Sequence, residues 1–158
     1  RSGSAVWNRK FDNGWAMSAT VADTIVYIGT SDDRIMVAAD ARTGREHWKT
    51  DVKFNVFGAA AVDNDQIVLG TIWGKAYGLD RASGKLKWFF ETDGFRKYHL
   101  EYFDQNDQFR TGAGAILRTP FEWIAAERRM GGMFSTPALH DGVIILTTTE
   151  GKVYALKE

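Results

Sequence analysis

The amino-acid sequence predicts an all-β protein of the β-propeller class, made of short four-stranded units. A Gly-x-x-x-Trp pattern occurs three times in the 158 residues, with spacings of 41 and 40 residues. Short apolar, β-branched runs recur at a similar interval, each preceded by a run of small residues. Four short strands every ~40 residues are typical of one propeller blade, and no helical period separates the strands as a βαβ fold would require.

The repeat spacing also divides the chain. The β-branched runs lie at 25–30, 66–71 and 143–148, and the third comes much later than the repeat period allows. An insertion is therefore expected before it. The predicted organisation is a single propeller segment over 1–158, with a repeat tail at 1–14, repeats at 15–53 and 54–94, an insertion at 95–132 and a repeat at 133–158.

Within each unit the order of strands follows from residue size. The runs of small residues predict the innermost strand, because blades converge at the propeller axis and leave little room there. The β-branched run, a run such as KAYGLD and the Trp-containing run follow as the second, third and outermost strands. The repeats then supply four, four and three strands, and Ser4–Phe11 is expected to form one more outermost strand. Three blades' worth of strands fall below the ~4–8 blades of a closed ring, so the ring is expected to be incomplete alone.

The Gly-x-x-x-Trp units carry a resemblance to a known family. Ala38-x-Asp40-x-x-Thr43-Gly44-x-x-x-Trp48 matches every defined position of the tryptophan-docking motif of PQQ-like (quinoprotein) β-propeller repeats. Gly78-x-Asp80-x-x-Ser83-Gly84-x-x-x-Trp88 matches with two conservative departures, and residues 2–7 resemble the tail of a third motif. The resemblance covers roughly 1–94 and 133–158. It implies that the tryptophans stack between neighbouring blades, as a structural clasp formed by Trp7, Ala38, Asp40, Thr43, Gly44, Trp48, Asp80, Ser83, Gly84 and Trp88.

The resemblance also implies a small set of expected functions. In the enzymes of this family, pyrroloquinoline quinone (PQQ) and Ca²⁺ occupy the centre of a complete ring, an Asp acts as base, and many alcohol dehydrogenases add a vicinal Cys pair. This chain has no Cys. We therefore expect the chain to belong to the non-enzymatic branch, represented by the outer-membrane assembly lipoprotein BamB. The expected function is that of a scaffold or interaction module that binds a protein or small ligand, without catalytic residues, cofactor or metal. The expected compartment is the periplasm or the outside of the cell. The alternatives are a fragment of a PQQ-dependent dehydrogenase and a regulatory or substrate-binding domain attached to a separate enzyme.

Composition excludes several other classes. The 20 basic residues balance the 20 acidic ones, so no overall field favours nucleic acid. No apolar run approaches the ~20 residues of a membrane span. The absence of Cys excludes disulfides, thiolate metal sites and a Cys nucleophile. The three histidines are scattered along the chain without the paired spacing of a metal site.

The insertion is where binding residues particular to this protein are expected, because loops on a rigid scaffold often carry function. Its first half, FRKYHLEYFDQNDQFR, is dense in aromatic and charged residues. Its second half predicts a short helix that begins after Thr119, has Pro120 in its first turn and stops at Gly131. Phe121, Ile124 and Ala125 are expected to form the apolar face of that helix. The candidate contact residues are Arg96, Tyr98, His99, Tyr102 and Trp123; the alternative is an excursion that only packs over one end of the propeller.

Open strand edges also predict assembly, because an unpaired edge invites pairing with another chain. Two copies are expected to exchange strands, with Ser4–Phe11 of each pairing with Val153–Lys157 of the other to give a six-bladed ring of two-fold symmetry. The alternative is that further blades come from other parts of a longer parent chain.

Overall fold

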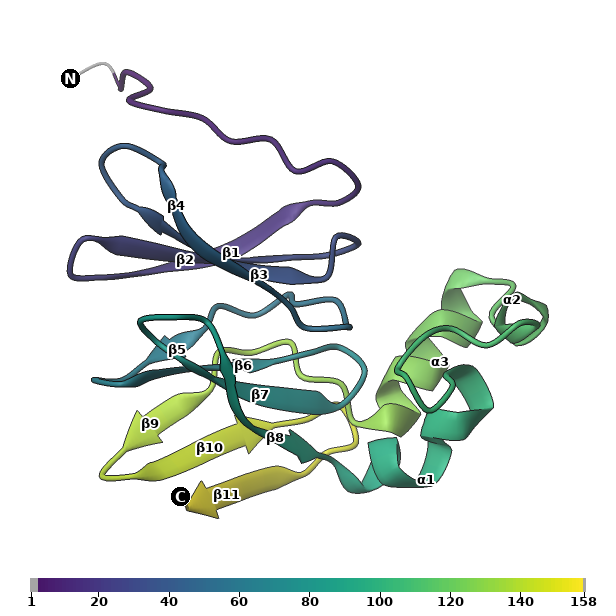
Figure 1. Cartoon of the computed structure of the whole chain (residues 1–158). Coiled ribbons are helices and arrows are strands. Elements are labelled where there is room, and N and C mark those ends of the chain that lie inside the picture. The colour runs from purple at the N-terminus through teal and green to yellow at the C-terminus, as the bar shows by residue number, and fades with distance from the viewer. Residues whose placement is uncertain (1–2, 158) are drawn as a thin grey trace.

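Three antiparallel sheets lie side by side, and a helical insertion projects from one side of them (Figure 1). The structure is a computed structural model, and it describes residues 3–157. This arrangement confirms the predicted propeller-type architecture of about three blades, and the three sheets do not close into a ring.

The first two sheets are complete four-stranded blades with strands in chain order. The first contains β1 (Ala16–Ala22), β2 (Ile25–Thr30), β3 (Ile35–Asp40) and β4 (Glu46–Asp51). The second contains β5 (Ala61–Val62), β6 (Gln66–Gly70), β7 (Lys75–Asp80) and β8 (Leu86–Glu91). The third sheet contains β9 (Ala138–His140), β10 (Val143–Thr147) and β11 (Val153–Lys157), so β11 is an edge strand.

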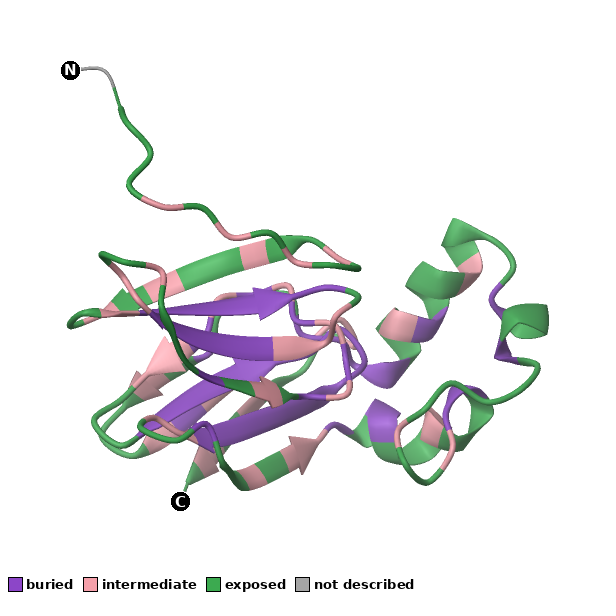
Figure 2. Ribbon diagram, turned by 45° about the horizontal axis from the view of Figure 1, so that its top comes forward, coloured by how far each residue is buried: buried purple, intermediate pink, exposed green. Residues whose placement is uncertain are grey.

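Burial follows the strand order within each blade. The middle strands β6 and β7 are buried along almost their whole length, which explains their continuous apolar sequence. The innermost strands contact one another in succession, β1 with β5 and β5 with β9, as strands near a common axis do. Figure 2 shows the buried residues concentrated in the middle strands of the first two sheets. Two apolar layers result, a larger one between the first two sheets and a smaller one between the second and third.

The two complete blades share a distortion at the same repeat position. The register between β3 and β4 shifts between Ala38 and Ala39, and the register between β7 and β8 shifts between Gly78 and Leu79. Both shifts lie just before the turn that leads to the Trp strand. A bulge of this kind changes strand direction and re-aims side chains, so the repeat in sequence is also a repeat in backbone geometry.

The helical content exceeds the one helix that we expected. The insertion holds α1 (Asp93–Tyr102), α2 (Ala113–Ile116) and α3 (Pro120–Met130). The predicted helix corresponds to α3, whereas α1 was not expected; Thr92 is its N-cap, and the Thr92 hydroxyl accepts a hydrogen bond from Phe95 N. The aromatic and charged composition of this segment concealed the helical pattern, because its apolar residues pack in more than one direction.

Ser4–Phe11, expected to form an outermost strand, forms no strand within the single chain. Residues 4–11 carry no strand assignment, and they run in an extended path along the outer face of the first sheet (Figure 1). Trp7 and Phe11 pack there against the apolar face of that sheet. A strand requires a hydrogen-bonded neighbour, and no neighbouring strand lies beside this segment in the described part of the chain.

Candidate functional site

The turn before each Trp strand is held by an aspartate. Asp40 Oδ1 accepts hydrogen bonds from Thr43 N (2.7 Å), Thr43 Oγ1 (2.8 Å) and Arg42 N (3.0 Å). These bonds, chiefly that of the Thr43 hydroxyl, lower the pKa of Asp40. Gly44 closes the turn with φ +70°, and its N–H donates to Asp40 O. The residue types at Asp40, Thr43 and Gly44 are therefore explained by the hydrogen bonds and the backbone conformation of this turn.

The second copy of the turn repeats this geometry. Asp80 Oδ1 accepts from Ser83 N (2.8 Å) and from the Ser83 hydroxyl, and the latter bond is the main cause of the lowered pKa of Asp80. Gly84 has φ +71°. Ser83 thus performs the same hydrogen-bonding function as Thr43, which is why this departure from the motif is conservative.

Trp48 joins the first sheet to the turn of the second. Its indole is 8% exposed, and Nε1 donates to Arg81 O at 3.1 Å. A Cβ added to Gly84 would lie 2.5 Å from Trp48 Cε3, so the indole rests directly on the glycine. Thr50, on the same strand, donates from Oγ1 to Gly84 O at 2.7 Å. The contact therefore combines apolar burial with two directed hydrogen bonds.

Trp7 makes the equivalent contact one blade earlier. Its Nε1 donates to Ala41 O at 3.0 Å, and its ring lies against Gly44, where an added Cβ would approach to 2.8 Å. Trp88 is half-buried and packs against the apolar layer of the third sheet, and its Nε1 donates to Gln66 Oε1 at 3.0 Å.

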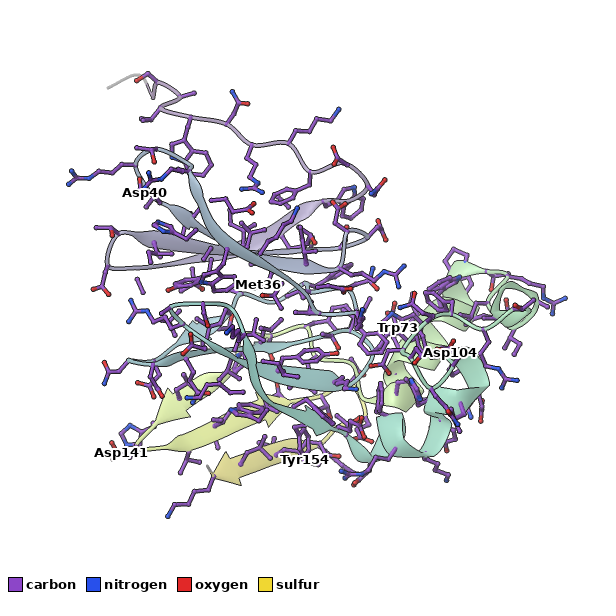
Figure 3. The ribbon with its side chains drawn as sticks, viewed as in Figure 1. Met36, Asp40, Trp73, Asp104, Asp141 and Tyr154 are labelled. Atoms are coloured by element: carbon purple, nitrogen blue, oxygen red, sulfur yellow. The ribbon has the colours of Figure 1, made fainter. Side chains whose placement is uncertain are left out.

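The insertion is attached to the blades by a cluster of aromatic rings. Trp73, in the turn between β6 and β7, is fully buried, and its Nε1 donates to Asn55 Oδ1 at 3.1 Å. Its ring packs at 5.0 Å from Phe103 and 5.6 Å from Trp123 (centroid distances). Figure 3 shows Trp73 on the side of the sheets that faces the insertion. Sequence reasoning missed this residue because it lies outside the Gly-x-x-x-Trp repeat.

A buried ionic cluster forms the second attachment. Lys75 Nζ lies 3.0 Å from Asp107 Oδ2 and 3.3 Å from Glu91 Oε1. Asp107 Oδ1 lies 2.9 Å from His99 Nε2, an ion-pairing distance without hydrogen-bond geometry. Asp107 adopts a left-handed backbone (φ +60°) in a turn held by Asp104, whose Oδ1 accepts from Asn106 N and Gln108 N. The turn therefore holds a carboxylate between β7 and α1.

A pocket of about 370 Å³ opens beside this cluster, lined by Lys75, Glu91, Phe95, Arg96, His99, Leu100, Gln105 and Asp107. Nearby, the hydroxyl of Tyr77 is buried and finds no hydrogen-bond partner among residues 3–157. Burial, reinforced by the carboxylates of Asp107, Asp51 and Glu91, raises the pKa of Tyr77. The pocket has both polar and apolar walls, and Lys75 already pairs with Asp107 and Glu91 there.

The structure separates the five predicted contact residues into two groups. Tyr102 is 3% exposed, and the ring of His99 stacks on Phe95 at 4.4 Å, so both belong to the interior of the insertion. Trp123 is 37% exposed, and its Nε1 donates to Leu117 O. Tyr102 and His99 therefore stabilise the insertion from inside, whereas Trp123 lies at its surface.

Arg96 and Tyr98 lie nearer the surface. Arg96 Nη2 lies 2.7 Å from Asp93 Oδ1. Lys152, with Arg96, lowers the pKa of Asp93 to about 2. The ring of Tyr98 carries the guanidinium of Arg129 at 4.1 Å.

Helix α3 begins and ends as predicted, but its apolar face is reversed. Thr119 and Glu122 form a capping box, and Gly131 ends the helix with φ +75°. The buried residues are Ala126 and Met130. The predicted apolar face of Phe121, Ile124 and Ala125 points to solvent instead, since Phe121 is 83% exposed and Ile124 is 60% exposed.

Two absences bear on chemistry and location. Within residues 3–157, His, Asp and Glu side chains form no group of three or more that could hold a metal ion. No helix in the same range is long and apolar enough to cross a membrane.

Taken together, the repeated sheets, the aspartate turns and the Trp contacts define an arc of PQQ-type β-propeller blades that carries a helical insertion. A family model described as outer membrane protein assembly factor BamB matches residues 1–107, and the chain therefore belongs to this family.

Solved structures agree on the fold. BamB from Moraxella catarrhalis matches with a TM-score of 0.55 at 20% identity, covering 85% of this chain and 30% of that one. The quinohemoprotein alcohol dehydrogenase from Comamonas testosteroni matches with a TM-score of 0.56 at 18% identity, covering 88% and 25%. The computationally designed protein Ika8 gives 0.55 at 14% identity, covering 89% and 32%. The chain thus spans a third or less of these proteins. No curated protein matches the chain.

Proposed function

We propose that the chain is part of a non-catalytic β-propeller that serves as a scaffold and interaction module for a protein partner outside the cytoplasm. The main support is that the tryptophans of the repeat and the charged residues around Asp107 make their contacts within the chain. Trp7, Trp48 and Trp88 pack at the seams of the sheets, and Asp107 forms an ion pair with Lys75 of the same chain. The family description, which names an assembly factor of the outer membrane, supports both the partner and the compartment.

The clasp is part of this proposal. Trp7 and Trp48 each fasten one blade to the next by covering the turn glycine of the following blade, and the Asp-x-x-Thr-Gly or Asp-x-x-Ser-Gly turn holds that glycine in place. An indole offers a large apolar area and one N–H that requires an acceptor. The turns provide that acceptor as a backbone carbonyl, that of Ala41 for Trp7 and that of Arg81 for Trp48.

The rival function is that of a PQQ-dependent dehydrogenase, whose fold this chain shares. Among residues 3–157, His, Asp and Glu side chains form no group of three or more that could hold Ca²⁺, so we derive no step through that cofactor. Reconstitution with pyrroloquinoline quinone and Ca²⁺, followed by dye reduction with alcohols and sugars, tests the proposal. We expect no turnover above a control without quinone; saturable turnover would refute the scaffold function.

We further propose that two copies complete a six-bladed ring by exchanging residues 4–11. An open apolar pocket of about 430 Å³ lies between β8 and the edge strand β11, lined by Trp88, Phe89, Phe90, Ile144, Leu156 and Lys157. In the complete blades, an outermost strand covers the corresponding third strand. Residues 3–6 are exposed, and no atom lies within 4 Å of a Cβ built on Gly3, so the segment is available.

The repeat also specifies the register of this exchange. Ala38 pairs with Trp48 and Gly78 pairs with Trp88, so Ala155 should lie opposite Trp7 of the second copy. By the same correspondence Val153 should lie opposite Arg9. In this register Trp7 keeps its present contact with Gly44 of its own chain. Residues 4–11 therefore do not have to leave the first sheet to pair with the second copy.

Light scattering at micromolar concentration tests the assembly, with a dimer expected. The chain has no Cys, so the double variant Val153→Cys/Arg9→Cys should form an interchain disulfide on mild oxidation. The control pair Val153→Cys/Asn8→Cys is one residue out of register, places its thiols on opposite faces and should cross-link much less. Deleting residues 1–11 should weaken the dimer. A folded monomer, or equal cross-linking by both pairs, contradicts the exchange.

A further inference from the structure

The α2–α3 connection and the exposed side of α3, which leads away from the sheets (Figure 1), carry large exposed apolar side chains. We call this surface the tip and define it by Ile116, Arg118, Phe121, Ile124 and Arg128. Phe121 is 83% exposed, Ile124 60% and Ile116 51%. Large apolar side chains that gather on a surface, unlike those scattered singly, mark a binding site.

Local hydrogen bonds hold the tip in shape. The carboxylate of Glu122 accepts from Arg118 N at 2.7 Å and Thr119 N at 2.8 Å, which ties the α2–α3 connection to the first turn of α3. Ala126 and Met130 take the buried side of that helix. Phe121 and Ile124, three residues apart, therefore share the side that faces solvent. Their exposure follows from the packing of α3 and not from fraying of its end.

The charge around the apolar residues is positive. Arg118 is 71% exposed at its side chain, and Arg128 lies seven residues after Phe121 on the same exposed side of the helix. The nearby acid, Glu122, is engaged by two backbone N–H groups and lies 3.6 Å from Arg118. An occupant of the tip must therefore offer an apolar layer beneath a negatively charged surface.

We infer that the tip binds the interface of an anionic lipid membrane. A helix with apolar residues on one side and arginines beside them lies in the interface, with its apolar side chains below the headgroups and its guanidinium groups among the phosphates. The long Arg side chains can reach the headgroups while Phe121 and Ile124 enter the acyl boundary. This inference is independent of the proposed ring and of the protein partner.

Vesicle flotation tests it directly. The full chain should float with phosphatidylcholine vesicles that contain a quarter phosphatidylglycerol, and should bind vesicles of phosphatidylcholine alone at least tenfold more weakly. Phe121→Ser/Ile124→Ser should lower the partition coefficient tenfold or more. Arg118→Gln/Arg128→Gln should reduce the preference for anionic vesicles, as should 0.5 M salt. The control Val21→Ser/Leu86→Ser, which removes similarly exposed apolar groups elsewhere, should bind like the original chain.

An environment-sensitive dye locates the contact. Because the chain lacks Cys, Ala125→Cys and Val21→Cys can each be labelled at one position. The dye at position 125 should shift to the blue with anionic vesicles and the dye at 21 should not. Melting curves of each variant verify the fold. If the original chain binds neither kind of vesicle, the inference is overturned. That result is expected if the tip instead fits an acidic groove on a protein. Retained binding by Phe121→Ser/Ile124→Ser overturns the inference as well.

Discussion

The indole of Trp48 lies on the backbone of Gly84 in the neighbouring sheet, so closely that a Cβ at Gly84 would stand 2.5 Å from the ring. The contact joins residues 36 positions apart through two features that each repeat supplies, an outermost-strand Trp and a turn glycine of positive φ. It couples the order of one blade to that of the next. The predictions below begin from this contact.

Replacement of Trp48 by Ala should destabilise the chain by about 3–5 kcal/mol, the range for emptying a buried aromatic site. The change removes the 8%-exposed indole and its bond to Arg81 O. Trp123→Ala should cost less, because Trp123 is 37% exposed. Urea unfolding curves measure both free energies of unfolding. The reverse ranking would mean that the insertion, and not the blade junction, limits stability.

Gly84→Ala should destabilise more than Gly142→Ala. Both glycines have φ near +70°, so both variants carry the ~1–2 kcal/mol cost of a left-handed Ala. Only the Cβ at position 84 meets a ring, whereas nothing lies within 4 Å of a Cβ at position 142. The difference between their unfolding free energies, from paired denaturant melts, isolates the contact with Trp48. Equal losses would show that the indole can move aside freely.

Lys75→Met should loosen the insertion from the blades. The change leaves Asp107 and Glu91 without their shared cation, and the expected cost is below the ~3–5 kcal/mol of a fully buried pair because Glu91 is partly exposed. Amide hydrogen exchange in α1 should accelerate while exchange in β2 and β3 stays slow. Lys53→Met, which breaks an exposed pair with Asp51, is the matched control. If amide hydrogen exchange in α1 does not change, the aromatic cluster alone attaches the insertion to the blades.

Glu127 should make the chain less stable as pH rises from about 5 to 7. Burial raises the pKa of this carboxyl to about 7 in the folded chain, against an ordinary value of 4.5. Between these values the unfolded chain has lost the proton and the folded chain has kept it, so raising the pH favours unfolding. Glu127 is only half-buried, and solvent screening leaves an effect on the order of 1 kcal/mol.

The test compares the original chain with Glu127→Gln in urea melts at pH 5, 6, 7 and 8. The variant should gain stability relative to the original as pH rises, and the gain should level off above pH 7. Carboxylates with lowered pKa, such as Asp40 and Asp80, contribute stability that is lost only at lower pH. They titrate equally in both chains and cancel. A pH-independent difference would contradict the assignment.

Short-range features of the sequence determined the blades. The Asp40–Thr43 and Asp80–Ser83 turns, the small inner strands and the capped helix after Thr119 were all predictable, because each is decided by residues within a few positions of one another. Repetition then made the architecture predictable, since one unit seen three times specifies neighbours as well as strands.

Tertiary structure decided what each insertion residue does. Tyr102 and His99 have the composition of a binding surface, yet they pack inside, Tyr102 against Trp73 and His99 against Phe95 and Phe103. Phe121 and Ile124 have the spacing of a buried face, yet they are exposed because Ala126 and Met130 fit against the sheets. Periodicity fixes which side chains share a side of a helix, but not which side meets the core. That choice depends on the shape of surfaces distant in sequence.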